Sequence, residues 1–110
     1  MPKYLVHGSY TLEGVKGLLR EGGSKRRAQF KENIGSLGGQ VESVYYAFGG
    51  DDVYAIVDLP DNVSSAAISL ALNAGGGFRA SIVVLLTPEE IDEAAQKAVS
   101  IRYRPPGQSQ

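Results

Sequence analysis

Two runs of aromatic and β-branched residues flank positions 49–52, which read Gly-Gly-Asp-Asp. Such runs suit a pleated, half-buried surface, and glycine and aspartate suit a tight turn. The pattern therefore predicts an antiparallel strand pair over 41–48 and 53–59. Pro60 ends the second strand because it has no N–H for the ladder, and the next residue, Asp61, can cap a helix.

The spacing of apolar positions predicts the other elements. Alternation over residues 4–10 indicates a first strand with two different faces. Apolar residues three and four apart indicate helices over 11–21 and 24–37, with the Gly22-Gly23 pair between them. The same criteria give a helix over 63–74, a strand over 78–86 and a helix over 88–98.

Three of these elements carry further expectations. The helix over 63–74 is apolar on nearly all sides, so it should touch the sheet and also another helix or a second subunit. The strand over 78–86 has a continuous apolar run, which is typical of a strand buried on both faces. Residues 87–90 read Thr-Pro-Glu-Glu, the signature of a capping box with proline at the first helical position.

The predicted order is β-α-β-β-α-β followed by a helix. This is an α+β, ferredoxin-like arrangement with a four-stranded antiparallel sheet, helices on one face and an added C-terminal helix. We expect one domain over residues 1–100 and a mobile tail over 101–110. Neither face of the predicted sheet is thoroughly polar, so a second copy of the chain is expected to cover the face away from the helices.

Composition narrows the possible functions. The 110 residues include no cysteine, which excludes disulfides, thiolate metal sites and a cysteine nucleophile. No apolar segment is long enough for a secretory signal or a membrane span, so we expect a cytoplasmic protein without a membrane partner. Residues 1–40 hold seven Lys and Arg against three Glu, whereas residues 41–100 hold two against nine acidic residues. With a net charge of only −1, the basic stretch at 25–31 is expected to be a solvated face that does not bind nucleic acid.

The segments that carry a family resemblance are spread over residues 1–99. They are 1–4 (Met-Pro-Lys-Tyr), 8–11 (Gly-Ser-Tyr-Thr), 13–18 (Glu-Gly-Val-Lys-Gly-Leu), 22–24 (Gly-Gly-Ser), 36–39 (Ser-Leu-Gly-Gly), 48–52 (Phe-Gly-Gly-Asp-Asp), 57–61 (Val-Asp-Leu-Pro-Asp) and 86–90 (Leu-Thr-Pro-Glu-Glu). In these segments the sequence resembles the GYD-domain family. The resemblance implies a ferredoxin-like protomer of the dimeric α/β-barrel superfamily, mostly bacterial, in which two sheets face each other. That superfamily contains both enzymes and ligand-binding regulators, so the fold does not fix the chemistry.

Few residues are candidates for chemistry. His7, the only histidine, lies in the first strand and can act as a general base, or it can be a histidine of the core or interface. For each tyrosine we favour a place in the core or the interface, and a ligand pocket built from His7, Tyr4, Tyr46 and Tyr54 is the first alternative to test.

Charged residues offer a second set of candidates. Asp58 and Arg79 can form a buried pair or bind a carboxylate, although an ordinary strand-end or intersubunit salt bridge also explains them. The aspartates around the turn lack the alternating oxygen ligands of a calcium loop, so no metal site is predicted. No cofactor is predicted either.

Two hypotheses follow. The first is a homodimeric small-molecule-binding or stress-related accessory protein without turnover, which can assemble further into a higher oligomer. The second is a cofactor-independent monooxygenase or isomerase that acts on a small hydrophobic cyclic substrate, with His7 as the base. A ligand-sized space in front of His7 would favour the enzyme, whereas a histidine packed against backbone would disfavour it.

Overall fold

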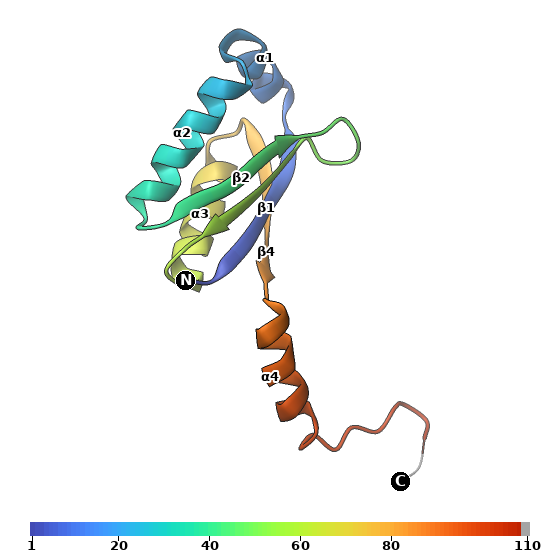
Figure 1. The fold of residues 1–110 in the computed structure, drawn as a ribbon. Coiled ribbons are helices and arrows are strands. Elements are labelled where there is room, and N and C mark those ends of the chain that lie inside the picture. The colour runs from blue at the N-terminus through green and yellow to red at the C-terminus, as the bar shows by residue number, and fades with distance from the viewer. Residues whose placement is uncertain (109–110) are drawn as a thin grey trace.

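The structure is a computed structural model that describes residues 1–108 (Figure 1). Its elements, in chain order, are β1 (Lys3–Tyr10), α1 (Leu12–Glu21), α2 (Gly23–Ser36), β2 (Gln40–Tyr46), β3 (Val53–Asp58), α3 (Asn62–Ala74), β4 (Phe78–Leu85) and α4 (Pro88–Ala98). The strands form one antiparallel sheet in the order β2-β3-β1-β4. The predicted α+β, ferredoxin-like fold is confirmed, with the first helical segment divided into α1 and α2.

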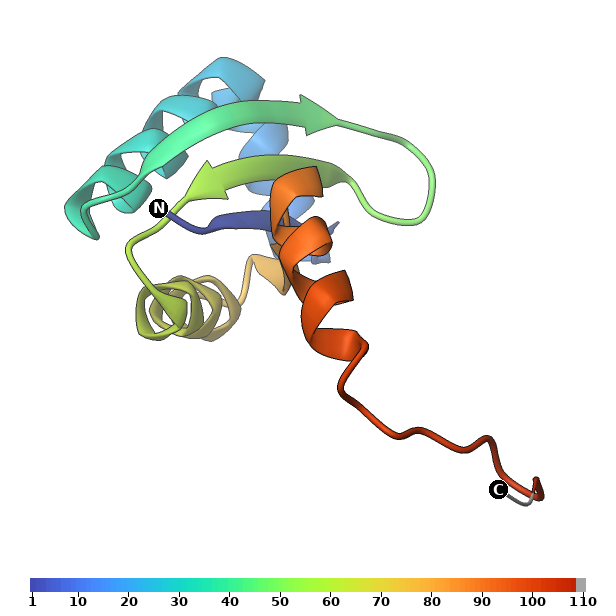
Figure 2. The ribbon, with the colours of Figure 1, turned by 60° about the horizontal axis from the view of Figure 1, so that its bottom comes forward.

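The helices α1, α2 and α3 all lie on one face of the sheet (Figures 1 and 2). We call this the covered face. Its strand residues pack with one residue each of α2 and α3 to form the core, which consists of Tyr4, Val6, Ala55, Val57, Leu59, Ile34 and Ile68. The opposite side, the open face, carries the alternate strand residues, which include Leu5, His7, Ser9, Tyr54, Ile56, Asp58, Ser81 and Val83. Each strand therefore contributes to two very different surfaces.

Local sequence explains where the helices begin and end. Gly22 separates α1 from α2 with a φ of 84°, a backbone conformation that side chains other than glycine rarely adopt. Asp61 caps α3 by accepting a hydrogen bond from the Ser64 N–H at 2.9 Å. The capping box predicted at the start of α4 is confirmed, because Thr87 and Glu90 each accept a hydrogen bond from the other's backbone N–H.

The expectation that the last strand is buried on both faces is wrong for the single chain. β4 is an edge strand, and its Val83 and Val84 remain 44% and 54% exposed. A continuous apolar run cannot distinguish a central strand from an edge strand whose apolar side chains are exposed. α3 packs against β4, while its Val63 and Leu70 are 78% and 72% exposed on the outer side.

α4 leaves the body of the molecule and extends away from the sheet (Figures 1 and 2). None of its residues is buried, including the apolar Ile91, and the molecule is elongated, with extents of 61 × 32 × 22 Å. Residues 101–108 form no helix or strand, and the last two residues of the predicted mobile tail lie outside the described part of the chain. Mobility of the tail stays a prediction. Among residues 1–108, no helix combines the length and the hydrophobicity needed to cross a bilayer.

Candidate functional site

His7 lies at the centre of the open face. β1 is flanked by β3 and β4, and its register places His7 opposite Tyr54 on one side and Ser81 on the other. Tyr45 on β2 pairs in turn with Tyr54. Because strand residues in register point to the same face, one row of polar and aromatic side chains crosses all four strands.

A carboxylate from the turn between β2 and β3 completes this row. The His7 Nδ1 lies 2.5 Å from Oδ2 of Asp51, and the Ser9 hydroxyl donates to Oδ1 of the same carboxylate at 3.2 Å. Asp52 anchors the turn, because its N–H donates to the Gly8 carbonyl at 2.8 Å and its carboxylate accepts from the Tyr10 N–H at 3.0 Å. The turn carboxylates therefore bond across to β1 instead of to their own backbone.

The Asp51 carboxylate determines which ring nitrogen of His7 carries the proton when the ring is neutral. The hydrogen bond from His7 is the largest cause that holds the pKa of Asp51 below its usual value, so the carboxylate is ionised at neutral pH and can only accept. His7 therefore donates through Nδ1, which leaves Nε2 as the acceptor when the ring is neutral. The side chains of His7 and Asp51 are 25% and 31% exposed, so an approaching molecule can reach them.

Tyr54 stacks on the histidine ring, with 6.1 Å between ring centroids and 12° between the planes. Tyr54 is exposed, although less so than Tyr45 beside it. Stacked rings hold the imidazole in one orientation and offer an aromatic surface to a ligand. The pair of His7 and Tyr54 was predicted as part of one site, and the structure brings these two together.

The other two tyrosines of the predicted pocket lie on the covered face. Tyr4 is completely buried, and its hydroxyl donates to Oδ1 of Asn62 at 2.7 Å. The Tyr46 hydroxyl donates to the Gly23 carbonyl at 3.3 Å, toward the start of α2. The four-residue pocket is therefore not formed, because His7 lies three positions after Tyr4 and successive strand residues alternate between faces.

Asp58 and Arg79 share the open face but lie at opposite ends of it. Asp58 is nearly buried and accepts a hydrogen bond from the Lys3 ammonium at 2.9 Å, and the same ammonium reaches Glu42 at 2.6 Å. The hydrogen bonds to these two carboxylates raise the pKa of Lys3, and the bond to Glu42 has the larger effect. His7, Ser9, Asp51 and Tyr54 form a group that we call the open-face cluster. Arg79 is opposite Ser9 in the register, so it flanks this cluster. Asp58 and Arg79 therefore do not pair with each other within the chain, and Asp58 instead forms the ordinary strand-end salt bridge, with Lys3 as its partner.

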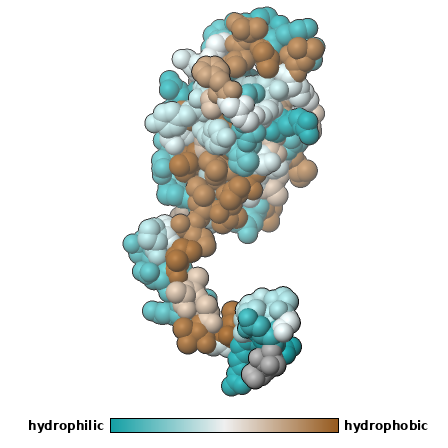
Figure 3. All heavy atoms as spheres, turned by 90° about the vertical axis from the view of Figure 1, so that its right-hand side faces the viewer, coloured by the Kyte–Doolittle hydropathy of each residue, from teal (hydrophilic) through white to brown (hydrophobic). Residues whose placement is uncertain are grey.

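The polar side chains of the open-face cluster lie next to apolar side chains. Figure 3 shows this side of the molecule, with a hydrophobic patch on the body beside the base of α4 and hydrophobic side chains along α4 itself. His7 is not packed against backbone, yet within one chain the cluster is a surface and not an enclosed pocket. Among residues 1–108, no three His, Asp or Glu side chains are grouped so that they could hold a metal ion.

Sequence reasoning missed Asp51 as the partner of His7. The residues are 44 positions apart, and only the β1–β3 register brings the turn over the end of β1. The signal available was the pair of aspartates in a turn next to a predicted central strand.

Comparison with known proteins gives one match. A sequence model of the GYD domain matches residues 4–95 of the chain. No curated protein and no solved structure matches it.

Proposed function

The chain belongs to the GYD-domain family, and from this membership and the open-face cluster we propose that it is a homodimer that binds a small hydrophobic molecule. In this proposal it is an accessory protein of the cytoplasm without turnover, and stress-related roles fit such a protein. The observation that carries the proposal is the open face, where the exposed apolar side chains of Tyr45, Tyr54 and Val83 accompany the His7–Asp51 pair. Two such faces laid together would enclose a space that one chain leaves open.

The exposed apolar surface supports the dimer. Tyr45, Tyr54 and Val83 of the open face are 72%, 40% and 44% exposed. Burial of one large apolar side chain contributes about 1.5–3 kcal/mol, so a face of this kind gains by association. Soluble monomers rarely leave large contiguous patches uncovered.

α4 supports it independently. Its capping box and the apolar spacing of Ile91, Ala94 and Ala98 belong to a helix made for packing, yet it buries nothing against its own chain. The exposed Ile91 and the neighbouring Val99, 86% exposed, offer an apolar stripe. A second copy of the chain is the occupant that the dimer would provide for this stripe.

The polar groups suggest what such a site binds. His7, Tyr54 and Arg79 all belong to the open face, with Tyr54 opposite His7 and Arg79 opposite Ser9 in the register. The apolar Leu5 lies on the other side of His7 along β1. Ligand sites are commonly apolar, with a few polar groups that fix orientation. A small cyclic molecule with one or two oxygen atoms suits this combination.

Native mass spectrometry of protein purified from its source tests both parts of the proposal. We expect a mass of twice 11.7 kDa plus a small molecule that is released on denaturation. His7→Ala should weaken retention of the molecule without changing the subunit count, whereas Ser36→Ala on α2 should change neither. A single-chain mass contradicts the dimer, and equal retention by the wild type and His7→Ala contradicts the site.

A second candidate function is supported by the His7–Asp51 hydrogen bond in particular. A carboxylate that holds Nδ1 leaves Nε2 as a general base, which can take a proton from a carbon or hydroxyl of a small hydrophobic cyclic substrate. An isomerase would return the proton at another atom. In a cofactor-independent monooxygenase the resulting carbanion would form a C–O bond with dioxygen, the histidine would return its proton to give a hydroperoxide, and loss of water would leave a carbonyl group.

Turnover of a substrate found by screening distinguishes the two candidates. General base catalysis contributes about 10²–10⁴-fold, so His7→Ala should lower kcat by that factor. Asp51→Asn should lower it less, and Ser81→Ala, in the same row on β4, should leave it nearly unchanged. Unchanged kcat in His7→Ala would remove the histidine from the mechanism, and binding without any product would favour the first candidate.

A further inference from the structure

A cavity lies on the other side of the sheet, between the strands and the helices α2 and α3. Its volume is about 60 Å³, and its apolar lining includes Val6, Phe30, Val44, Ala55, Leu72 and Phe78. A single water needs about 10–15 Å³ of such volume, so the cavity has room for several atoms of a ligand. A hollow of about 350 Å³ adjoins it and shares Tyr10, Arg26, Leu72 and Phe78 with it.

The polar groups of this cavity are two phenols and two guanidinium groups. They belong to Tyr10, Tyr46, Arg26 and Arg27, and of the two arginines only Arg26 also lines the adjoining hollow. The Tyr10 ring contacts Phe78 edge-on with 5.0 Å between centroids. Burial, and then the Tyr46 hydroxyl, raise the pKa of Tyr10 to about 12. Tyr10 therefore stays protonated at neutral pH and can donate a hydrogen bond.

Arg26 is only weakly engaged by its own chain. Its guanidinium reaches Glu21 at 3.4 Å, with side chains that are 38% and 47% exposed. Exposed pairs of this kind contribute little, so another carboxylate can replace Glu21.

We propose that this pocket, which we call the helix-side pocket, binds a small carboxylic acid with an apolar or aromatic body. The carboxylate pairs with Arg26 and accepts from Tyr10, and the body lies between Leu72 and Phe78. Planar guanidinium and carboxylate groups match in geometry, and an apolar lining rewards an apolar body. The helix-side pocket is separate from the open-face cluster, because it lies on the opposite face of the sheet.

Titration with benzoate, followed by two-dimensional NMR of the labelled full chain, tests the proposal. Benzoate should shift the signals of Tyr10, Leu72 and Phe78, and Arg26→Gln should suppress these shifts without changing any shift of His7 or Tyr54. Benzamide, which lacks the charge, and acetate, which lacks the body, should each bind at least about tenfold more weakly, because each loses one of the two kinds of contact. Equal binding of benzoate and benzamide, or no binding of benzoate, would overturn the proposal.

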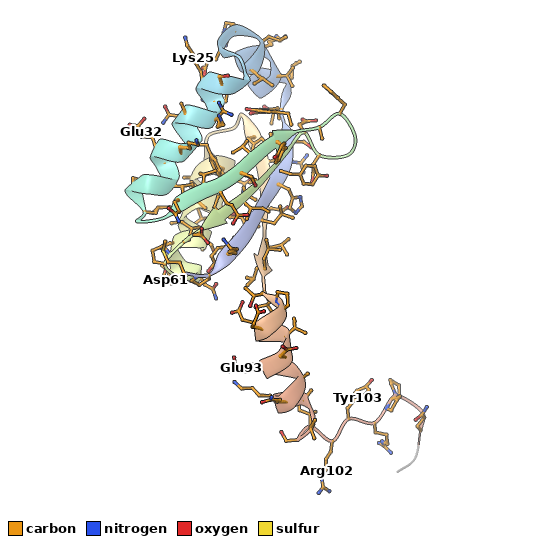
Figure 4. All side chains as sticks on the ribbon, viewed as in Figure 1. Lys25, Glu32, Asp61, Glu93, Arg102 and Tyr103 are labelled. Atoms are coloured by element: carbon orange, nitrogen blue, oxygen red, sulfur yellow. The ribbon has the colours of Figure 1, made fainter. Side chains whose placement is uncertain are left out.

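Two matched variants assign the charge to Arg26. Arg26→Gln should weaken benzoate about ten- to hundredfold, since it removes a charge-assisted pair. Lys25→Gln removes the same charge from the adjacent residue, which points away from the body (Figure 4), and should leave the affinity unchanged. Equal losses in both variants would reveal general attraction by the basic helix and contradict a built site. Leu72→Phe, with folding checked by circular dichroism, should abolish binding by filling the pocket.

Discussion

The two faces of the sheet come from the same four strands but differ in how they are completed. On the covered face, Tyr4 and Val57 are fully buried against Ile34 of α2. On the open face, Tyr45 and Tyr54 remain 72% and 40% exposed. The chain therefore completes one hydrophobic core by itself, and in the proposed dimer a second copy covers the other surface. Stability should therefore depend on one face, and assembly and binding on the other.

The largest contrast is expected from core truncation. Ile34→Ala should lower the free energy of unfolding by about 2–5 kcal/mol, because it opens a cavity in the covered core. The same truncation on α4, Ile91→Ala, should change it by less than about 0.5 kcal/mol in dilute protein, since the side chain is 52% exposed. Urea unfolding at one low concentration measures both. Equal losses of unfolding free energy would contradict the distinction between the covered core and the exposed helix α4.

A charge on the open face should act on assembly instead. Ile56→Glu places a carboxylate among the apolar side chains of that face, and its burial between two copies would cost the pair several kcal/mol. We expect a folded single chain by light scattering and circular dichroism, whereas Ile56→Leu keeps the pair. An Ile56→Glu variant that still forms a pair would place the contact elsewhere.

Removal of one hydroxyl on each face gives a finer comparison. Tyr4→Phe removes the buried hydrogen bond to Asn62 and should cost about 1 kcal/mol of unfolding free energy. Tyr54→Phe should lower the free energy of unfolding by less than about 0.5 kcal/mol, but it should weaken the binding of a ligand to the open face. Chemical denaturation of both variants, alongside the wild type, checks the order.

Alkaline titration probes the covered side. The pKa of Tyr10 is raised from 10.0 to about 12, so the folded chain holds this proton more tightly than the unfolded chain does. Stability should be unaffected by this group below pH 10.0 and should fall as the pH rises toward 12. The ultraviolet absorbance of phenolate should show a late component that Tyr10→Phe removes. An unchanged late component in the variant would assign it to another tyrosine.

The smallest effect is expected on the acid side of the open face. The folded-state pKa of Asp51 is depressed, chiefly by His7, so its contribution to stability is present above the ordinary value of 3.8. That contribution is lost as the pH falls through the depressed value. Asp51→Asn should therefore flatten the decline of unfolding free energy in this acidic range. A decline as steep as in the wild type would contradict the His7–Asp51 pair.

Much of this arrangement could be predicted from the sequence because it depends on neighbours. The capping box at Thr87, the helix break at Gly22 and the β2–β3 pair all follow from residues a few positions apart. His7 and Tyr54 could be assigned to strands in the same way. Alternation along β1 would also separate Tyr4 from His7, so that part of the site was within reach.

The remaining features depend on contacts between distant segments. The register shift between Val41 and Ser43 interrupts the alternation of β2, so counting from one end gives the wrong faces beyond it. Asp51 reaches His7 only because β3 pairs with β1 in one register. Likewise, Lys3 takes Asp58 because the two residues are opposite each other, which leaves Arg79 at the other end. Residue types alone do not specify these partners.

The central claim is that a second copy of the chain covers the open face. Sedimentation velocity of the wild-type protein at micromolar concentrations tests it most directly, because it reports mass and shape together. We predict a species of twice 11.7 kDa that is more compact than two elongated single chains. A species of 11.7 kDa throughout the concentration range would contradict the claim.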